Sequence, residues 1–502
     1  MKKKIVLWLT GYDWTEFAVA YYLQKNHNYD FYAIIDVQNN PKKFFEEQKL
    51  VNFKKIWFYH DYLNNPPPID PDYLGSFEKK YNIPIITIAK NDRIFMEKFN
   101  SFHKFSNEEI IQIVGSECKL FEEVFQEIKP DFFLTLETAF RPHHFFYLFC
   151  KRKNIRILML NAANWGDYCY ISENYHLLEN FKGKFLEKTT DETTFDEQQK
   201  RFNEMKLSNK TKTFFKSQRI SIFSKLYSAF YYLLKSNNKT QKSHYTYYGR
   251  TKLKVLFNEI FLHFKRWNRK KFIDKNLSYE IPTKSKLIFF ALQQEPERSL
   301  LISVPDYIDQ VKNVNFIAES IPENYTLVVK EHPTQGPPAR DWRKISDYQS
   351  MIRNSRVKLI HHSVPADQII KNSDLVISAS GTITLESAFF GIPSITFADN
   401  DYPLISSISK LESGSDLSNL INNSLKIKGN PNDLKKYFDI LENNSFIFNL
   451  YEFQLAYYKQ FYFDANLFDV EISECDMENF LKDQKEKLEK LADEFNKKIS
   501  ND

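Results

Sequence analysis

Short apolar runs alternate with helical patterns in two stretches of this 502-residue chain, and no other feature constrains the fold as much. A buried strand that is followed by an amphipathic helix and then by another buried strand is typical of parallel sheets, whose two faces are both covered by helices. One such stretch lies before residue 180 and the other after residue 283. Since 502 residues exceed what one ordinary core holds, the pattern predicts two Rossmann-like α/β domains.

The expected elements follow from the apolar periodicity and from the turn residues between the runs. In the first stretch the predicted strands are 4–9, 30–36, 55–59, 84–89, 131–137 and 156–161, and the predicted helices are 16–24, 108–128 and 145–153. In the second stretch the predicted strands are 286–293, 325–331, 357–362, 374–380 and 393–398, and the predicted helices are 307–321, 366–371 and 384–390. A charged helix is expected at 476–499. The predicted boundaries are therefore a first domain at 1–180, a helical insertion at 181–283, a second domain at 284–430 and a helical tail at 431–502.

The insertion is strongly basic and rich in aromatic residues. Residues 206–275 hold 18 Lys and Arg against two acids, Glu259 and Asp274, so their net charge is +16. Two segments, 221–235 and 251–272, space apolar residues as a helix does, with basic residues between them. One interpretation is a helical insertion with a solvated basic face. The other is a surface that lies on anionic lipid or grips an acidic acceptor. Nucleic acid is not expected, because no nucleic-acid motif accompanies the charge.

Other features bound the class of protein. No apolar run reaches the roughly 18 to 20 residues that span a bilayer, and the apolar run after the N-terminal lysines is too short for a signal peptide. The four cysteines show no paired spacing, which fits a reducing cytosol. We therefore expect a cytoplasmic protein.

The sequence SASGTITLE, residues 378–386, follows a predicted strand and opens a helix. Small residues such as Gly381 let a backbone approach a ligand closely, and Ser380 and Thr382 add hydroxyl donors to the N–H groups of the helix start. This pattern predicts a phosphate cradle, with Glu386 placed to accept hydrogen bonds from a ribose diol. The alternative is an ordinary turn with a Ser or Thr cap, in which Glu386 completes a capping box.

The sequence LVVKEHP, residues 327–333, delivers charged groups at the end of another predicted strand. Ligands of doubly wound sheets bind at the carboxyl ends of strands, so His332 is expected to reach the same phosphate, with Pro333 fixing its direction. Lys330 and Glu331 should point to opposite sides of the strand, one of them as a buried pair partner. A structural histidine at a strand end is the alternative interpretation.

A third polar loop, QQEPERS, follows the first strand of the second domain. Gln294 and Glu295 suit hydrogen bonding to sugar hydroxyls or the support of a catalytic partner. A plain acidic loop is the alternative.

Together, ALQQEPERS, LVVKEHP and DLVISASGTITLESAFFGIPSITF resemble the capsule and surface polysaccharide biosynthesis family, which is similar to bacterial Kdo and sialic acid transferases. The resemblance covers about residues 286–405. It implies a GT-B glycosyltransferase, in which two Rossmann-like domains face each other across a cleft, an acceptor domain first and a nucleotide-sugar domain second. Carried over, the donor is held by His332–Pro333, by Ser380, Gly381 and Thr382, and by Glu386 near the ribose.

The same resemblance implies an acceptor-side general base on the first domain, usually a carboxylate. Asp13, Glu137 and Asp167 lie at expected strand ends and are the candidates, although a cap, a turn or an ion pair is the alternative role for each. No metal and no cofactor are expected, because a helix start, a histidine and hydroxyls can offset the charge of a leaving phosphate.

The sequence thus predicts a glycosyltransferase that moves a sugar from a nucleotide donor to a surface glycan or lipid-linked acceptor. His332 with the Ser-Gly-Thr turn favours a CMP-activated acidic sugar, with UDP sugars left open. Contact with the inner face of a membrane through residues 206–275 is part of this expectation. The alternatives are a nucleotide-sugar epimerase of the UDP-GlcNAc 2-epimerase type and a non-catalytic subunit of glycan assembly.

Overall fold

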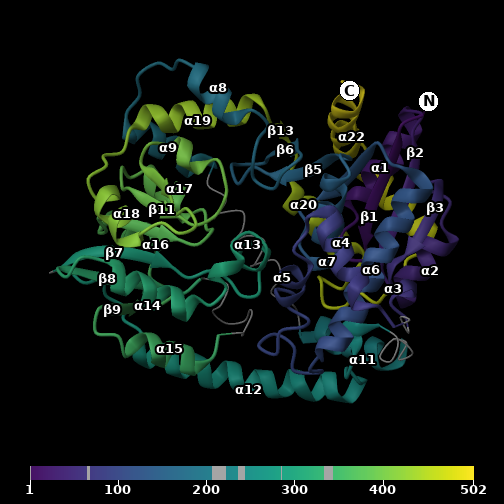
Figure 1. Ribbon diagram of the computed structural model, residues 1–502, viewed down its shortest axis with the longest axis horizontal. Coiled ribbons are helices and arrows are strands. Elements are labelled where there is room, and N and C mark those ends of the chain that lie inside the picture. The colour runs from purple at the N-terminus through teal and green to yellow at the C-terminus, as the bar shows by residue number, and fades with distance from the viewer. Residues whose placement is uncertain are drawn as a thin grey trace. The chain divides into compact units, whose positions relative to one another are not determined.

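The computed structural model describes residues 2–64, 68–205, 222–235, 244–283, 285–332 and 343–501, of which 222–225 and 235 are described by backbone alone. These residues form two compact units (Figure 1). Unit 1 takes the described residues within Met1–Glu179, Lys206–Val255 and Asn444–Asp502. Unit 2 takes those within Asn180–Met205 and Leu256–Asn443.

Unit 1 is built on a seven-stranded sheet of order β13-β6-β5-β4-β1-β2-β3. Its strands are β1 (Lys4–Thr10), β2 (Asp30–Asp36), β3 (Phe53–Phe58), β4 (Phe132–Leu136), β5 (Arg156–Ala162), β6 (Tyr168–Ser172) and β13 (Phe446–Ile447). The first five are parallel, and β6 and β13 extend one edge in antiparallel pairing. The order β3-β2-β1-β4-β5 is that of a doubly wound sheet, as the alternating pattern predicts.

Helices cover both faces of this sheet. They are α1 (Thr15–Asn26), α2 (Asn39–Glu47), α3 (Tyr59–Tyr62), α4 (Pro71–Tyr81), α5 (Ile85–Lys90), α6 (Asn107–Ile128), α7 (Arg141–Arg152), α11 (Ile222–Lys235), η2 (Tyr245–Tyr247), α20 (Leu450–Phe461), α21 (Glu474–Asp483) and α22 (Lys485–Ser500). Successive side chains of β1 enter different cores: Leu7 and Leu9 join one apolar cluster, whereas Val6 and Trp8 join the other. This is the burial on both faces that a central parallel strand requires.

The strand predicted at 84–89 is wrong, because this segment is helix α5 (Ile85–Lys90). Ile85 and Ala89 lie one helical turn apart and are buried, while Ile86 is exposed. A run of six apolar and β-branched residues is too short to separate the two periods, and the sheet ends at β3 without a place for it.

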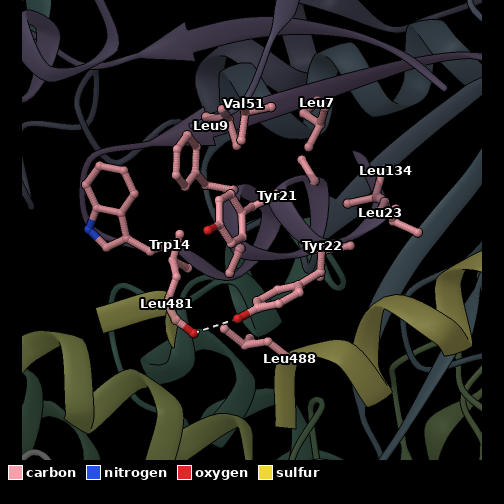
Figure 2. Packing of buried hydrophobic residues seen from close by; sticks show 14 of the residues in the cluster. Leu7, Leu9, Trp14, Tyr21, Tyr22, Leu23, Val51, Leu134, Leu481 and Leu488 are labelled. Carbon is pink, nitrogen blue, oxygen red and sulfur yellow. Dashed lines mark hydrogen bonds between the residues drawn. The ribbon is translucent and has the colours of Figure 1, made fainter. Parts of the chain in front are cut away.

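The charged C-terminal helix expected at 476–499 is in fact two helices, α21 and α22, which meet at Gln484. Figure 2 shows Leu481 and Leu488 beside Tyr22 of α1, whose hydroxyl donates to the Leu481 carbonyl at 2.8 Å. The buried side of α22 belongs to the same cluster as strand residues Leu7 and Leu9. The tail is therefore part of the core of unit 1.

Unit 2 is built on a six-stranded parallel sheet of order β12-β11-β10-β7-β8-β9. Its strands are β7 (Lys286–Ala291), β8 (Tyr325–Lys330), β9 (Val357–Ile360), β10 (Leu375–Ser378), β11 (Ser394–Thr396) and β12 (Ile408–Lys410). Its helices are α8 (Phe181–Glu187), α9 (Phe195–Met205), α13 (Arg298–Leu301), η3 (Pro305–Tyr307), α14 (Gln310–Ser320), α15 (Ile345–Ile352), α16 (Ala366–Lys371), α17 (Ile383–Ala388), η5 (Tyr402–Leu404), α18 (Leu417–Ser424) and α19 (Pro431–Asn443), with most of α12 (Lys252–Asn276). This chain is thus an α/β protein of two Rossmann-like units.

The two units divide the predicted insertion, 181–283, between them. α8 and α9 belong to unit 2, where Phe181 packs on Tyr437 of α19 and Phe202 stacks on Phe389. α11 and the first turn of α12 belong to unit 1. Sequence composition marks the basic segment well, but it does not show which core each apolar helix face completes.

Candidate functional site

Three neighbouring strands of unit 2 end together at one edge of the sheet. The register pairs Ser378 of β10 with Ala291 of β7, and Ala291 with Lys330 of β8. The loops that follow hold all three sequence motifs. The strand order reverses between β10 and β7, and such a switch point is where open α/β sheets bind ligands.

Gln293 ties the loops after β7 and β10 together. Its side-chain amide donates to the Ser378 hydroxyl at 2.7 Å, and this hydroxyl also accepts the Gly381 backbone N–H at 3.1 Å. A Cβ atom at Gly381 would lie 2.8 Å from Gln293 Nε2 and 2.9 Å from Ser378 Oγ. A side chain at this position would therefore force Gln293 or Ser378 to shift, so glycine lets the turn pack closely against these two buried polar groups.

Glu331 has a structural role in a buried ion cluster. Its carboxylate accepts from Arg343 Nε at 2.6 Å, from the Tyr348 hydroxyl, and from its own neighbour, the His332 backbone N–H, at 2.8 Å. Arg343 Nη1 also donates to Glu295 at 3.1 Å. Burial disfavours the charge of Glu331, but Arg343 and the hydrogen bonds outweigh it, and the pKa of Glu331 is lowered.

Glu295 belongs to this cluster. It is buried, and its carboxylate also accepts from Gln310 of α14 at 2.7 Å. In the structure, Glu295 thus holds Arg343 and Gln310 in place. Gln294, which precedes it, is buried as well.

Lys330 points away from this ion cluster, as the alternation along a strand requires. It is 5% exposed, and within the described residues no hydrogen bond or ion pair engages its ammonium group. Burial lowers the pKa of Lys330, and the carboxylates of Glu331, Glu386 and Asp367 oppose this shift. A buried cation without a direct partner costs free energy, so this position is suited to an anionic ligand.

The turn before α17 carries the hydroxyl groups. Ser380 Oγ is buried, and no described group hydrogen-bonds to it. Thr382 makes no side-chain cap; its hydroxyl instead donates to Glu386 at 3.3 Å. The capping box that was the alternative interpretation of SASGTITLE is therefore absent from the described contacts. Of the two hydroxyls of this turn, that of Ser380 is the one without a described partner.

His332 directly follows Lys330 and Glu331 and is half-buried, with its backbone bonded to Glu331. Pro333 lies outside the described residues. The structure thus brings Lys330, the Gln293 loop and the Ser380–Thr382 turn to one sheet edge, with Glu386 acting electrostatically on Lys330.

The candidate bases lie at the corresponding edge of unit 1. Asp13 follows β1 and accepts the Thr15 N–H at 2.9 Å at the start of α1, and burial raises its pKa despite that bond. Glu137 follows β4, with Oε1 3.9 Å from His176 Nε2. Asp167 lies in the turn between β5 and β6. Burial raises the pKa of the Cys169 thiol to about 12, and the carboxylates of Glu137 and Asp167 add to this rise.

Glu16 is an acidic residue of this edge that sequence reasoning missed. It is buried in the first turn of α1 and accepts the Leu136 N–H of β4 at 3.0 Å, so it links the start of α1 to the end of β4. Burial, and next the Asp13 carboxylate, raise the pKa of Glu16 well above its ordinary value. Its position in an expected helix start was the available signal, but a first-turn glutamate is usually assigned to helix stabilisation.

A metal site is not evident in the described residues, since no three His, Cys, Asp or Glu side chains there are grouped to hold an ion. Two Asp-x-Asp sequences occur elsewhere. Asp70 caps α4, which has Asp72 in its first turn, and Asp399 pairs with Lys410 at 3.0 Å. The unit 2 edge offers cationic, N–H and hydroxyl donors, and this chemistry suits a phosphate group.

No helix in the described part of the chain is long and apolar enough to cross a bilayer.

Residues 193–403 match the model of a protein family described as capsule polysaccharide biosynthesis protein. The matched segment contains the whole unit 2 edge described above. A search of curated proteins finds no match.

Several solved structures are similar over much of their length. A β-Kdo 2,7 transferase, KpsC, from Thermosulfurimonas dismutans is 10% identical, with 70% of this chain and 95% of that one covered and a TM-score of 0.28. A putative UDP-N-acetylglucosamine 2-epimerase from Listeria monocytogenes is 13% identical, with 88% and 95% covered and a TM-score of 0.24. A UDP-GlcNAc 2-epimerase from Neisseria meningitidis, bound to UDP-GlcNAc, is 14% identical, with 90% and 96% covered and a TM-score of 0.23.

All three TM-scores lie below 0.5, so the fold assignment rests on the strand order of the two sheets and not on these structures. The likeness to this family rests on the matched segment, which includes every strand of unit 2 except β12. Through residues 193–403, which are less than half of its 502 residues, this chain is similar to the capsule polysaccharide biosynthesis protein family.

Proposed function

We propose that this protein is a glycosyltransferase of capsule polysaccharide biosynthesis that uses a nucleotide-activated sugar. The observation that carries the proposal is Lys330, a buried residue whose ammonium has no direct partner among the described residues and which lies on the sheet edge that holds the Ser380–Thr382 turn. A phosphate of the donor would supply a direct ion-pair partner for Lys330. As negative charge grows on the leaving phosphate, Lys330 and the turn donors stabilise it, so no metal is needed.

Each remaining residue of the edge has a proposed role toward the donor. Glu386 accepts hydrogen bonds from the ribose hydroxyls, while His332 and Pro333 contact the phosphate. Gln294 and Glu295 shape the sugar side of the site, Glu295 through its ion pair with Arg343. Gly381 keeps the turn close enough for its N–H groups to reach the donor. A CMP-activated acidic sugar is the preferred donor, and UDP sugars are the second choice.

Unit 1 supplies the acceptor site and the general base. Asp13 is the preferred base, because it is only half-buried and its raised pKa makes it a better proton acceptor. Glu16 is bound to the Leu136 backbone and positions the loop. Glu137 and Asp167 stay as further candidates. The acceptor is a surface glycan or a lipid-linked glycan, which places the enzyme in the cytoplasm with peripheral contact to the membrane through residues 206–275.

The test is a product assay with CMP- and UDP-sugars, with and without a lipid-linked glycan acceptor, read by mass spectrometry. A transferase releases the nucleotide and lengthens the acceptor. An epimerase converts the sugar of the donor without any acceptor, and that outcome would replace our proposal. Lys330→Met should lower turnover at least about tenfold, since a charge-assisted hydrogen bond is worth roughly 1.5–3 kcal/mol. Lys312→Met, at an 84% exposed side chain of unit 2, is the matched control. If both variants lose turnover equally, Lys330 has no specific role in binding the donor phosphate.

A further inference from the structure

Helix α12 (Lys252–Asn276) carries a stripe of large apolar side chains that the rest of the described protein leaves uncovered. Its members are 53% to 67% exposed. They recur at spacings of three and four residues, so they lie on one face of the helix: Leu253, Phe257, Ile260, Phe261, Phe264 and Trp267. We refer to these six residues as the α12 stripe. A soluble helix normally turns such a face toward its own core.

Basic residues are frequent on the helix that carries the α12 stripe. α12 holds eight Lys and Arg and only two acids, Glu259 and Asp274. Asp274 is already paired with Lys270 at 2.5 Å. Two of the lysines lie over stripe rings: Lys265 Nζ is 4.5 Å from the centre of Phe261, and Lys271 Nζ is 3.4 Å from the centre of Trp267. The apolar face therefore has a cationic border.

Each end of α12 makes contacts within its own unit. Beyond the last turn, Leu277 is buried in the core of unit 2, as Ile273 is within it. At the first turn, the Lys252 ammonium donates to the Leu233 carbonyl of α11 at 2.7 Å. α12 itself is one continuous helix of 25 residues.

The segment that leads into α12 is anchored in unit 1. Arg141 donates to the Tyr245 hydroxyl at 3.3 Å, and this hydroxyl also lies 3.2 Å from that of Tyr59. His244 stacks on His60 with ring centres 3.6 Å apart. All of these side chains are buried. Such a specific buried anchor indicates that the start of α12 has one defined position.

Helix α11 repeats the pattern on a smaller scale. Its exposed apolar side chains again recur at helical spacing: Leu226, Tyr227, Phe230, Leu233 and Leu234. Tyr227 and Tyr231 hold the helix to unit 1 through Phe463. Both helices of the basic segment thus present apolar surface.

We propose that the α12 stripe docks on an anionic lipid bilayer, with its aromatic side chains at the boundary between headgroups and acyl chains. This deepens the membrane contact that is part of the proposed function, and it stands whether or not the enzyme proves to be a transferase. An interfacial helix combines a cationic border with an apolar face rich in Phe, Leu and Trp, as α12 does. The basic residues bind anionic lipid headgroups, and the apolar side chains of the α12 stripe are transferred from water into the bilayer interface.

Two other occupants fit less well. An acidic glycan would satisfy the lysines, but it offers no apolar phase for three Phe rings and Trp267. A second copy of the chain would cover the stripe, but it would bring two strongly basic helices together. Like charges placed side by side oppose that pairing. A bilayer of anionic lipid satisfies both the charge and the apolar surface.

The test is flotation of the purified full-length protein with vesicles of phosphatidylcholine alone and of phosphatidylcholine with phosphatidylglycerol. We expect binding to the anionic vesicles that weakens as salt is raised. Phe261→Ser combined with Phe264→Ser should weaken binding by about tenfold or more, from the lost apolar transfer alone. Phe316→Ser, at a 41% exposed phenylalanine of α14, is the matched control and should bind like the wild type.

A spectroscopic readout separates insertion from simple charge attraction. Trp267 is exposed, whereas Trp8, Trp14, Trp57 and Trp165 are buried, so brominated acyl chains should quench Trp267 on binding. Trp267→Phe should lose most of this quenching. Binding that the double Phe variant leaves unchanged, or a lack of quenching, would overturn the proposal. So would a dimer in analytical ultracentrifugation that the double variant dissociates, or binding to a soluble acidic polysaccharide in preference to vesicles. Nucleotide binding is measured separately, so it can fail without affecting this result.

Discussion

At the scale of single residues, the two charged side chains at the end of β8 have different surroundings and different roles. Glu331 turns toward Arg343 and Tyr348 and fixes the strand end, while Lys330 lies within the electrostatic influence of Glu386 and Asp367. Sequence reasoning predicted that one of this pair would be a buried partner. It could not identify Arg343, because the partner lies 12 residues further along the chain, beyond a loop that no periodicity describes.

Removal of the Arg343 guanidinium should measure how much this buried ion cluster contributes to the stability of unit 2. Arg343→Met leaves the buried carboxylates of Glu331 and Glu295 without their guanidinium, and we expect a loss of about 3–5 kcal/mol in the free energy of unfolding. Glu331→Gln should lower the free energy of unfolding by less, because Arg343 still forms its ion pair with Glu295. Urea unfolding followed by circular dichroism measures both, with Glu319→Gln on the exposed side of α14 as control.

The same cluster gives a pH dependence whose sign follows from the lowered pKa of Glu331. Its stabilisation is present above the unfolded pKa of about 4.3 and is lost as the pH falls through the lower folded value. Glu331→Gln should therefore flatten the acid side of the stability curve. If the decrease in stability at acid pH is the same in Glu331→Gln as in the wild type, the ionisation of Glu331 does not cause it.

At the scale of elements, long periodic segments were predictable and short apolar runs were not. The helix α6 and the strands β1, β2 and β5 lie within a residue or two of their predicted bounds, because their patterns repeat several times. Six residues at α5 do not repeat enough to distinguish a helix from a strand. The predicted strands at 286–293 and 374–380 both end two residues early, at Ala291 and Ser378, and the residues beyond them form the candidate site.

The element α22 tests whether the charged tail is core or solvated surface. Phe495 is buried in the cluster that includes α1, so Phe495→Ala should destabilise unit 1 by about 3–5 kcal/mol. Lys490→Ala, on the exposed face of the same helix, should have little effect. Thermal unfolding followed by tryptophan fluorescence measures both variants. If Phe495→Ala and Lys490→Ala have equal melting temperatures, α22 does not contribute to the core of unit 1.

At the scale of the whole molecule, the alternation of strands and helices was enough to predict two Rossmann-like units. The motif order was enough to place the polar loops at the edge of the second sheet. The unit boundaries were not predictable in the same way, because α8 and α9 join unit 2 through contacts with α19, far along the chain. The choice among carboxylates in unit 1 also depended on burial, which a sequence pattern does not report.

The central claim is that the edge of unit 2 binds a nucleotide phosphate. The measurement is thermal unfolding of the purified protein with CMP, UDP, GDP and CDP, without metal and then with magnesium. At about 100 times its dissociation constant, a bound nucleotide should add roughly 2.7 kcal/mol of stability. We predict this shift with CMP without metal, and its loss in Gly381→Ala, where a Cβ would meet Gln293 and Ser378. Gly75→Ala, whose Cβ meets nothing within 4 Å, should keep the shift. If no nucleotide shifts the wild-type melting temperature, the edge of unit 2 is not a donor site and the account is contradicted.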